Sequence, residues 1–224
     1  QWFYFFQPRN FYVVTKSKIF VDGKLVTMGT IIPIDKFGNA IIPYKNMRGY
    51  VYFKSLNLKG FEGLNYGYLS YTSENVLKLA FNCLGDKYGW GGENGQKDCS
   101  SFINTIFRCF GIFIGRNISN QKFCGRENFD LSLLDICNKK QKISSLMPGS
   151  ELIFDGHGMI YIGNENNNPY IIHCLAEVAV LKQDLFKKQW GINRVMKVIV
   201  TDTDIYRTGS NGSFIQNISK AVIY

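Results

Sequence analysis

The sequence has few histidines and no long hydrophobic run. Only two of its 224 residues are histidines, His157 and His173. No apolar stretch reaches the roughly 20 residues of a transmembrane helix, and no cationic segment precedes a short apolar run as in a secretory leader. We therefore expect no transmembrane segment. Because the chain begins at Gln1 rather than at a methionine, prior removal of a leader or an upstream domain stays open.

The six cysteines lack the paired C-x-x-C spacing of zinc sites and the density of a disulfide scaffold. Neither zinc ligation by these cysteines nor a disulfide-stapled fold is therefore expected, and most of them are expected to be small buried hydrophobic residues. The cysteines are Cys83, Cys99, Cys109, Cys124, Cys137 and Cys174.

Positive charge is abundant but scattered. The formal net charge is +9, yet no dense run of Lys and Arg with interleaved aromatic residues occurs. Such diffuse charge favours attraction to anionic partners over a nucleic-acid-binding surface. We therefore expect no nucleic-acid partner.

Residues 1 to 58 contain short β-rich runs separated by turn signals such as Asp22-Gly23. This spacing predicts a small all-β barrel or meander over residues 10–58. Residues 1–9, which include the run Trp2 to Phe6, are interpreted as the last strand of a preceding module. Residues 59–72 are rich in glycine and tyrosine without a period and are predicted to be a linker.

Two amphipathic helices are expected after this linker. Thr72 or Ser73 can cap the first helix, and Gly85 ends it. In the second helix, apolar residues between Phe102 and Phe110 recur at helical spacing, and the helix starts at Cys99. A candidate nucleophile therefore begins a helix.

The rest of the chain changes from helical to strand patterns. Residues 117–147 have weak periodicity and are predicted to form short helices and loops. From Glu151 onward short apolar runs alternate with Gly and Asn turns, including a long loop from Gly163 to Pro169, and the tail from Thr201 is expected to wrap back. Helices followed by antiparallel strands are typical of an α+β domain, here residues 73–224.

The candidate thiol and the two imidazoles have the chemistry of a nucleophile and its base. A helix N-terminus lowers the pKa of a thiol such as Cys99, whereas burial in an apolar helix face raises it. Pairing of neighbouring strands would bring His157 and His173 together. One histidine could then take the thiol proton while the other bonds its second ring nitrogen.

Other interpretations of these three residues stay open at this point. A single cysteine on an apolar helix face is most often a core residue, and a histidine in a strand is usually a satisfied polar group. Two histidines and a cysteine could also bind a metal, although their spacings match no zinc pattern.

Several short motifs follow one another in a distinctive order along the chain. They are Gly85-Asp86-Lys87-Tyr88-Gly89-Trp90-Gly91-Gly92, Asp98-Cys99-Ser100, Gly115-Arg116-Asn117-Ile118-Ser119-Asn120-Gln121, Pro148-Gly149, Gly156-His157-Gly158-Met159-Ile160-Tyr161-Ile162-Gly163 and Ile172-His173. Their order resembles the NlpC-type cysteine peptidases of bacterial cell walls, and the resemblance covers roughly residues 73 to 200. It implies a papain-like cysteine peptidase domain with helices packed on an antiparallel sheet.

The resemblance assigns the catalytic roles. Cys99 is implied to be the nucleophile, His157 the general base and acid, and His173 the residue that orients His157. Tyr88 matches a family tyrosine that helps to hold the oxyanion beside the Cys99 amide. Ser101 departs from the glycine that often follows Cys-Ser in the family.

Substrate-binding residues are implied in the same way. Asp98 and Ser100 match positions that bind the free amine of an N-terminal L-alanine in related enzymes. Arg116 and Ser119 fall in a segment that commonly lines the pocket.

Residues 10–58 resemble a bacterial SH3-like domain, with Arg48-Gly49-Tyr50-Val51 as its closing strand. Together the two parts resemble γ-D-glutamyl-L-diamino acid endopeptidases, also called dipeptidyl-peptidase VI-like enzymes. In these the SH3-like domain shapes one wall of the cleft and restricts it to short stem peptides.

The resemblance thus implies a cysteine endopeptidase that cleaves the γ-D-glutamyl to L-diamino acid bond of peptidoglycan stem peptides. Its expected partners are stem peptides with a free N-terminal L-alanine. Its expected location is the bacterial cell envelope, periplasmic or secreted, with cytoplasmic recycling as the alternative. A non-catalytic wall-binding module and an amidase or acyltransferase on the same fold are the rival functions.

Overall fold

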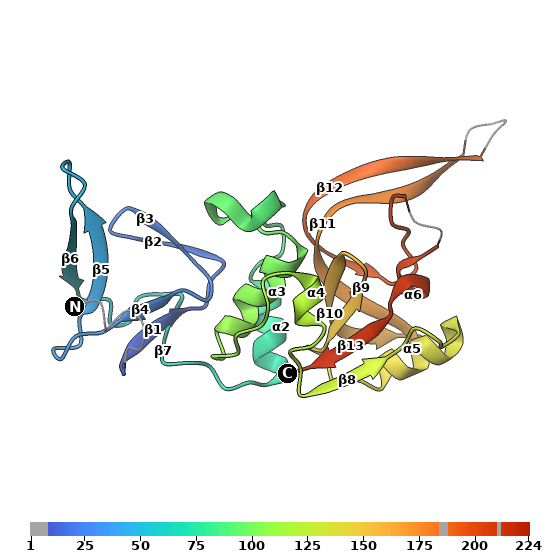
Figure 1. Ribbon diagram of the computed structural model, residues 1–224, viewed down its shortest axis with the longest axis horizontal. Helices are drawn as coiled ribbons and strands as arrows, with labels where there is room; N and C mark the ends of the chain where they lie inside the picture. Colours follow the sequence, from blue (N-terminus) through green and yellow to red (C-terminus); the bar gives the residue numbers. More distant parts are fainter. Residues whose placement is uncertain (1–8, 184–187, 210–211) are drawn as a thin grey trace.

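A computed structural model describes residues 9–183, 188–209 and 212–224 (Figure 1). The predicted strand Trp2 to Phe6 lies outside these residues. The first part of the chain is all-β, as predicted. Its strands are β1 (Phe11–Val14), β2 (Lys18–Val21), β3 (Lys24–Thr27), β4 (Ile31–Pro33), β5 (Ala40–Lys45), β6 (Val51–Leu56) and β7 (Leu64–Tyr66).

The N-terminal strands form one three-stranded sheet and two hairpins. β1 lies between β4 and β7, while β2 pairs with β3 and β5 pairs with β6. A small core of its own fills this part: Val14, Ile19, Val21, Ile32, Ala40, Ile42 and Leu58.

The predicted linker 59–72 needs a correction, because it contributes a strand. β7 pairs with β1 through Val13 opposite Asn65, so the β-rich part extends to Tyr66. A strand of three residues is too short to show an alternating pattern within a glycine- and tyrosine-rich segment, so the sequence did not reveal it.

The second part is built on a six-stranded sheet. The strand order is β12-β11-β10-β9-β13-β8, and every neighbouring pair is antiparallel. The strands are β8 (Glu127–Asp130), β9 (Glu151–Phe154), β10 (His157–Glu165), β11 (Asn168–Gln183), β12 (Lys188–Asp202) and β13 (Lys220–Ile223). The tail therefore returns to the sheet as expected, because β13 lies between β9 and β8.

Helices cover both faces of this sheet (Figure 1). Ile153, Ile160 and Ile172 pack with α2 and α3 in one core, whereas Leu152, Met159 and Ile171 pack with α5 and α6 in another. Neighbouring residues of a strand thus serve opposite cores, as the two-residue period of a strand requires. The helical elements are α2 (Ser73–Phe81), η1 (Trp90–Gly95), α3 (Cys99–Arg108), α4 (Ile118–Gln121), α5 (Ile136–Ser144) and α6 (Phe214–Asn217).

The expected long loop Gly163 to Pro169 is wrong. β10 and β11 stay paired to Glu165 opposite Asn168, which leaves a two-residue turn. Asn166 and Asn167 both have positive φ, 51° and 61°. Asparagine tolerates this conformation, and two such residues suit the tight turn of a hairpin, so the two strands can continue to the turn.

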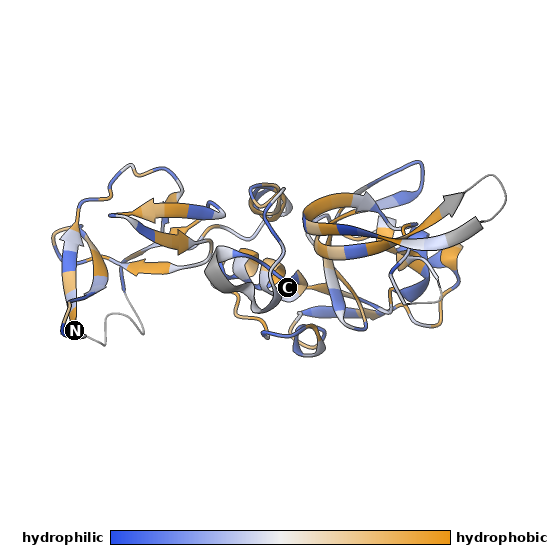
Figure 2. Ribbon diagram, turned by 90° about the horizontal axis from the view of Figure 1, so that it is seen from above, coloured by the Kyte–Doolittle hydropathy of each residue, from blue (hydrophilic) through white to orange (hydrophobic). Residues whose placement is uncertain are grey.

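The two parts of the chain share buried contacts. Val13 and Met28 of the N-terminal part belong to the same core as α2 and α3. The buried ammonium of Lys97 donates to Ser17 Oγ at 3.0 Å and to Asp86 Oδ2 at 3.1 Å. Hydrophobic residues recur along the strands of both parts in Figure 2. An apolar core and a polar cluster therefore join the parts directly beside Asp98 and Cys99.

All six cysteines are free, and only half of them follow the expectation of burial. Cys83, Cys109 and Cys174 are buried, Cys99 is intermediate, and Cys124 and Cys137 are exposed. None of the helices in the described part of the chain is both long and apolar enough to cross a membrane.

Candidate active site

Cys99 is the first residue of α3, as the sequence predicted. Asp98 caps this helix by accepting a hydrogen bond from the Ser101 amide at 2.7 Å, and the Ser101 hydroxyl accepts from the Asp98 amide at 2.8 Å. This reciprocal pair is a capping box, which fixes the first turn of the helix. The nucleophile candidate therefore stands on a rigid helix start.

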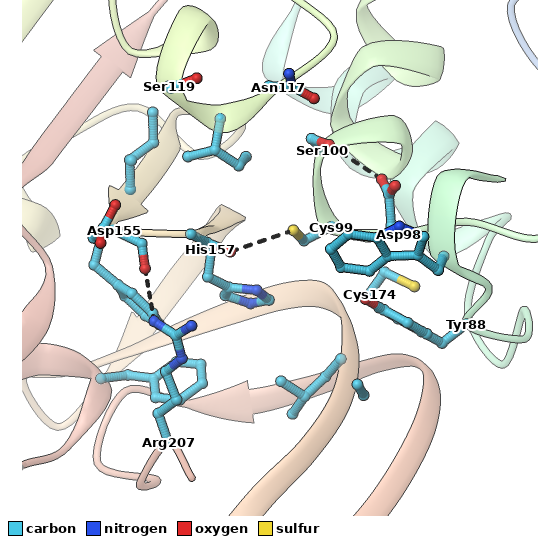
Figure 3. A pocket seen from close by; sticks show the side chains of 18 of the residues that line it. Tyr88, Asp98, Cys99, Ser100, Asn117, Ser119, Asp155, His157, Cys174 and Arg207 are labelled. Atoms are coloured by element: carbon cyan, nitrogen blue, oxygen red, sulfur yellow. Dashed lines mark hydrogen bonds between the residues drawn. The ribbon is translucent and has the colours of Figure 1, made fainter. Parts of the chain in front are cut away.

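The histidines lie together at the sheet end that faces this helix. His157 Nε2 is 2.9 Å from His173 Nδ1, and both rings are buried. The thiol of Cys99 lies 3.8 Å from the carbonyl oxygen of Gly156, the residue before His157 (Figure 3). The structure thus brings together the three residues that the resemblance implied.

A fourth residue, which the sequence did not reveal, continues this chain of contacts. The hydroxyl of Thr201 on β12 lies 3.2 Å from Nε2 of His173. A His173 ring that donates from Nε2 to Thr201 keeps Nδ1 as an acceptor for the N–H of His157. Because Nε2 of His157 is then engaged, its Nδ1 is the nitrogen that can act as the base.

Burial favours the uncharged forms of the Cys99 thiol and of the two imidazoles. Burial, followed by the positive charge of Arg207, lowers the pKa of His157 to about 3, and burial also lowers the pKa of His173. Burial raises the pKa of the Cys99 thiol, against hydrogen bonds from backbone amides that lower it. A neutral thiol and a neutral imidazole are therefore the resting forms at neutral pH.

Tyr88 lines a pocket together with Cys99 and His157, and it is half-buried against the core of α2 and α3. Its amide donates to the carbonyl oxygen of Met196 at 2.9 Å. Met196 has a φ of 52° at an irregularity in the β11–β12 pairing, and this irregularity presents the carbonyl to Tyr88. Burial raises the pKa of Tyr88, so its hydroxyl stays protonated and can donate.

Asp98 and Ser100 are linked to Arg116. The guanidinium donates to Asp98 Oδ2 at 2.7 Å and to Ser100 Oγ at 2.7 Å. Burial raises the pKa of Asp98, but hydrogen bonds from Arg116 and Ser101 outweigh it and hold the pKa below its usual range. Ser119, on α4, is exposed at the rim of the same pocket.

All of the predicted site residues except the fully buried His173 line one cavity of about 680 Å³. The cavity is also lined by residues that the sequence did not identify, Asp155, Glu177, Arg207 and Thr208. They come from a turn, from β11 and from the tail, so no local motif connects them. Figure 3 shows Asp155 and Arg207 on the opposite side of His157 from Asp98 and Cys99.

The expectation that an SH3-like domain shapes one wall of the cleft does not match this cavity. Within the described residues, the lining begins at Tyr88 and includes nothing from positions 9–72. The β-rich part instead packs behind η1, where a Cβ on Gly95 would lie 3.1 Å from the Leu25 side chain. It supports the pocket wall from outside.

The described residues contain no group of three or more His, Cys, Asp and Glu side chains that could hold a metal ion. The arrangement that they do contain is a thiol, a base and an orienting residue in one pocket. This set can carry out acyl transfer through a thioester.

Comparisons with known proteins show the family and the fold of the chain. Residues 85–198 match the model described as the NlpC/P60 family. No curated protein matches the sequence.

Two solved structures resemble the chain in fold. A novel NlpC/P60 endopeptidase from Photobacterium damselae subsp. piscicida has a TM-score of 0.76 at 18% identity, covering 96% of this chain and 53% of that one. An NlpC/P60 family protein from Bacillus cereus has a TM-score of 0.58 at 17% identity, covering 96% and 63%. This chain thus spans only half to two thirds of their lengths.

Proposed function

The chain belongs to the NlpC/P60 family, generally cysteine peptidases that act on peptidoglycan, and from this premise we propose that it hydrolyses the γ-D-glutamyl to L-diamino acid bond of stem peptides. The observation that carries the proposal is the placement of Cys99 at a helix start beside the His157–His173 pair. Reaction through a thioester needs no metal and no cofactor.

The first half of the reaction forms the thioester. His157 Nδ1 accepts the thiol proton as Cys99 Sγ attacks the γ-carbonyl carbon of D-glutamate. The amide of Cys99 at the helix N-terminus and the Tyr88 hydroxyl stabilise the oxyanion. The C–N bond then breaks as the proton on His157 passes to the leaving amine.

The second half releases the acyl product. Water attacks the thioester carbon and gives its proton to His157 Nδ1. The C–S bond breaks, and the proton returns to the sulfur of Cys99. His173 keeps the imidazole of His157 in one orientation throughout, because the 2.9 Å contact engages the second nitrogen.

The acyl side of the substrate is assigned to the cluster of Asp98, Ser100, Arg116 and Ser119. Asp98 and Ser100 provide acceptors for the free amine of an N-terminal L-alanine. The guanidinium of Arg116, whose side chain is 46% exposed, and the Ser119 hydroxyl provide donors for the D-glutamate carboxylate.

The β-rich part, predicted over residues 10–58 and extended by β7 to Tyr66, is proposed to be an SH3-like domain with a separate role in contacting the bacterial cell wall. The net charge of +9 suits the anionic polymers of a bacterial cell envelope. We place the protein in that envelope, periplasmic or secreted.

The cleavage test uses L-Ala-γ-D-Glu-diaminopimelate peptides analysed by mass spectrometry. Wild type is expected to release L-Ala-D-Glu, and Cys99→Ala is expected to release none. Cys137→Ala is the matched control, because Cys137 is exposed and lies outside the pocket. Release of L-Ala-D-Glu by Cys99→Ala would contradict the mechanism.

The amine site is tested separately. Acetylation of the L-alanine amine is expected to lower kcat/KM about tenfold or more, since it removes the charge that faces Asp98. Asp98→Asn keeps an N-cap side chain, so α3 stays capped while the carboxylate charge is lost. Equal cleavage of free and acetylated peptides by wild type would exclude this amine site.

A further inference from the structure

The path of the catalytic proton determines on which side of the thiol the leaving group lies. In the proposed reaction, His157 passes its proton to the leaving amine, so the leaving group must lie on the His157 side of the thiol. The acyl side then lies toward Asp98 and Ser100, next to Cys99. The diamino acid consequently lies on the opposite side of His157, toward Asp155 and Arg207 (Figure 3), and Glu177 and Thr208 line the same cavity.

Arg207 lies directly against the catalytic residues on that side. Its guanidinium is 3.3 Å from where a Cβ on Gly156 would stand, and the carbonyl of this same glycine lies 3.8 Å from the Cys99 thiol. Arg207 Nη1 donates to the Asp155 carbonyl oxygen at 2.6 Å (Figure 3). One residue, Gly156, thus separates a fixed cation from the nucleophile.

Two acidic residues accompany this cation in the lining of the cavity. Glu177 on β11 accepts a hydrogen bond from Thr208 Oγ1 at 2.7 Å, and Thr208 directly follows Arg207 in the chain. Asp155 is exposed, and its carbonyl oxygen accepts the hydrogen bond from Arg207 (Figure 3). The cavity lining therefore includes a guanidinium and two acidic residues that these hydrogen bonds connect to it.

We propose that Arg207 and Glu177 form the subsite for the distal centre of meso-diaminopimelate, with Arg207 binding its carboxylate and Glu177 its ammonium. The inference rests on the proposed function, which leaves the diamino acid open. A bidentate guanidinium is the side chain best suited to a carboxylate, and the carboxylate of Glu177 suits an ammonium.

Lysine can make only one of the two contacts proposed for the distal centre of diaminopimelate. Its side chain ends in an ammonium, which Glu177 or Asp155 can bind, but it has no distal carboxylate for Arg207. Diaminopimelate carries both charges on one carbon. The pairing of opposite charges therefore discriminates between two leaving groups of similar length.

The experiment compares three peptides of the form L-Ala-γ-D-Glu-X-D-Ala. X is meso-diaminopimelate, the same residue with its distal carboxylate amidated, or L-lysine. The added D-alanine holds the proximal carboxylate in an amide, so that only the distal group varies. The values of kcat and KM are measured for wild type, Arg207→Gln, Arg207→Lys and Glu177→Gln.

Wild type is expected to prefer the diaminopimelate peptide about tenfold or more over both others. Arg207→Gln is expected to lower kcat/KM for that peptide about ten- to hundredfold, mainly through KM, and to change the lysine peptide less than about twofold. Arg207→Lys should retain part of the preference. Glu177→Gln should weaken all three peptides, because each has a distal ammonium.

Arg126→Gln is the matched control, because Arg126 pairs with Glu127 on the surface and lies outside the cavity. Equal losses on all three peptides in Arg207→Gln would show a merely structural role and overturn the inference. Cleavage by wild type without preference would overturn it too, and leave the proposed function standing. Failure of wild type on all three peptides would overturn both.

Discussion

The hydroxyl of Thr201 lies 3.2 Å from Nε2 of His173, at the far end of a line of contacts that begins at His157. His173 is completely buried, so its ring has no solvent to satisfy that nitrogen. Thr201 is therefore the residue that decides which nitrogen of His173 carries the proton.

Replacement of Thr201 by valine is expected to lower kcat about tenfold with little change in KM. The cause is a buried N–H left without an acceptor, which favours the wrong tautomer of His173. Steady-state kinetics measure the change, and Thr201→Ser is expected to restore most of the activity. A loss that appears only in KM would contradict this role.

The pH dependence of kcat/KM follows from the pKa of His157, lowered to about 3. The base form of a group with a depressed pKa persists above that pKa, so acidification from pH 7 to 5 should not protonate His157. A flat acid side of the profile over this range is expected, measured with the diaminopimelate peptide. An inflection near pH 6.5 would show an ordinary histidine instead.

Glu151 should make stability fall with rising pH. The Tyr224 hydroxyl donates a hydrogen bond to this fully buried carboxyl, and burial raises the pKa of Glu151 to about 8. Since the folded state holds this proton more tightly than the unfolded state, the stabilisation is complete below about pH 4.5 and is lost as pH rises through 8.

The matched variant for this test is Glu151→Gln, which stays neutral at all pH values. Its melting temperature is expected to exceed that of wild type at pH 9 and to approach it at pH 5. Differential scanning calorimetry at both pH values measures the change. A constant difference between the two proteins would contradict a buried, neutral Glu151.

Lys97 is expected to be a large contributor to the stability of the whole chain. Its ammonium is almost completely buried, and its partner Asp86 has a side chain only 17% exposed. Lys97→Met should cost about 3 kcal/mol, because it leaves the Asp86 charge without its partner. Urea denaturation measures this loss, and the Arg126→Gln surface variant should cost less than about 1 kcal/mol.

Adding Asp86→Asn to Lys97→Met should recover part of the stability, since the stranded charge is then removed. No recovery in the double variant would mean that the cost comes from lost packing rather than from charge.

Local sequence signals predicted the parts of the site that short segments determine. A helix start at Cys99 and strands at His157 and His173 follow from periodicity, and the structure has all three. Their mutual approach follows from antiparallel pairing, which needs only the order of the strands.

The residues that escaped prediction depend on distant pairings. Thr201 reaches His173 through the register of β11 and β12, and Arg207 reaches Gly156 from the tail after β12. Neither register nor the path of a tail is encoded in a local period. The same limit hid β7 and the Arg116 contact with Asp98, which joins residues 18 positions apart.

The uncharged state of Cys99 also affects its chemical lifetime. Oxidants and alkylating agents attack thiolates far faster than thiols, and burial raises the pKa of this thiol. A nucleophile that becomes anionic only while His157 takes its proton spends little time in the vulnerable form. The apolar surroundings that raise the pKa of Cys99 thereby protect its sulfur between turnovers.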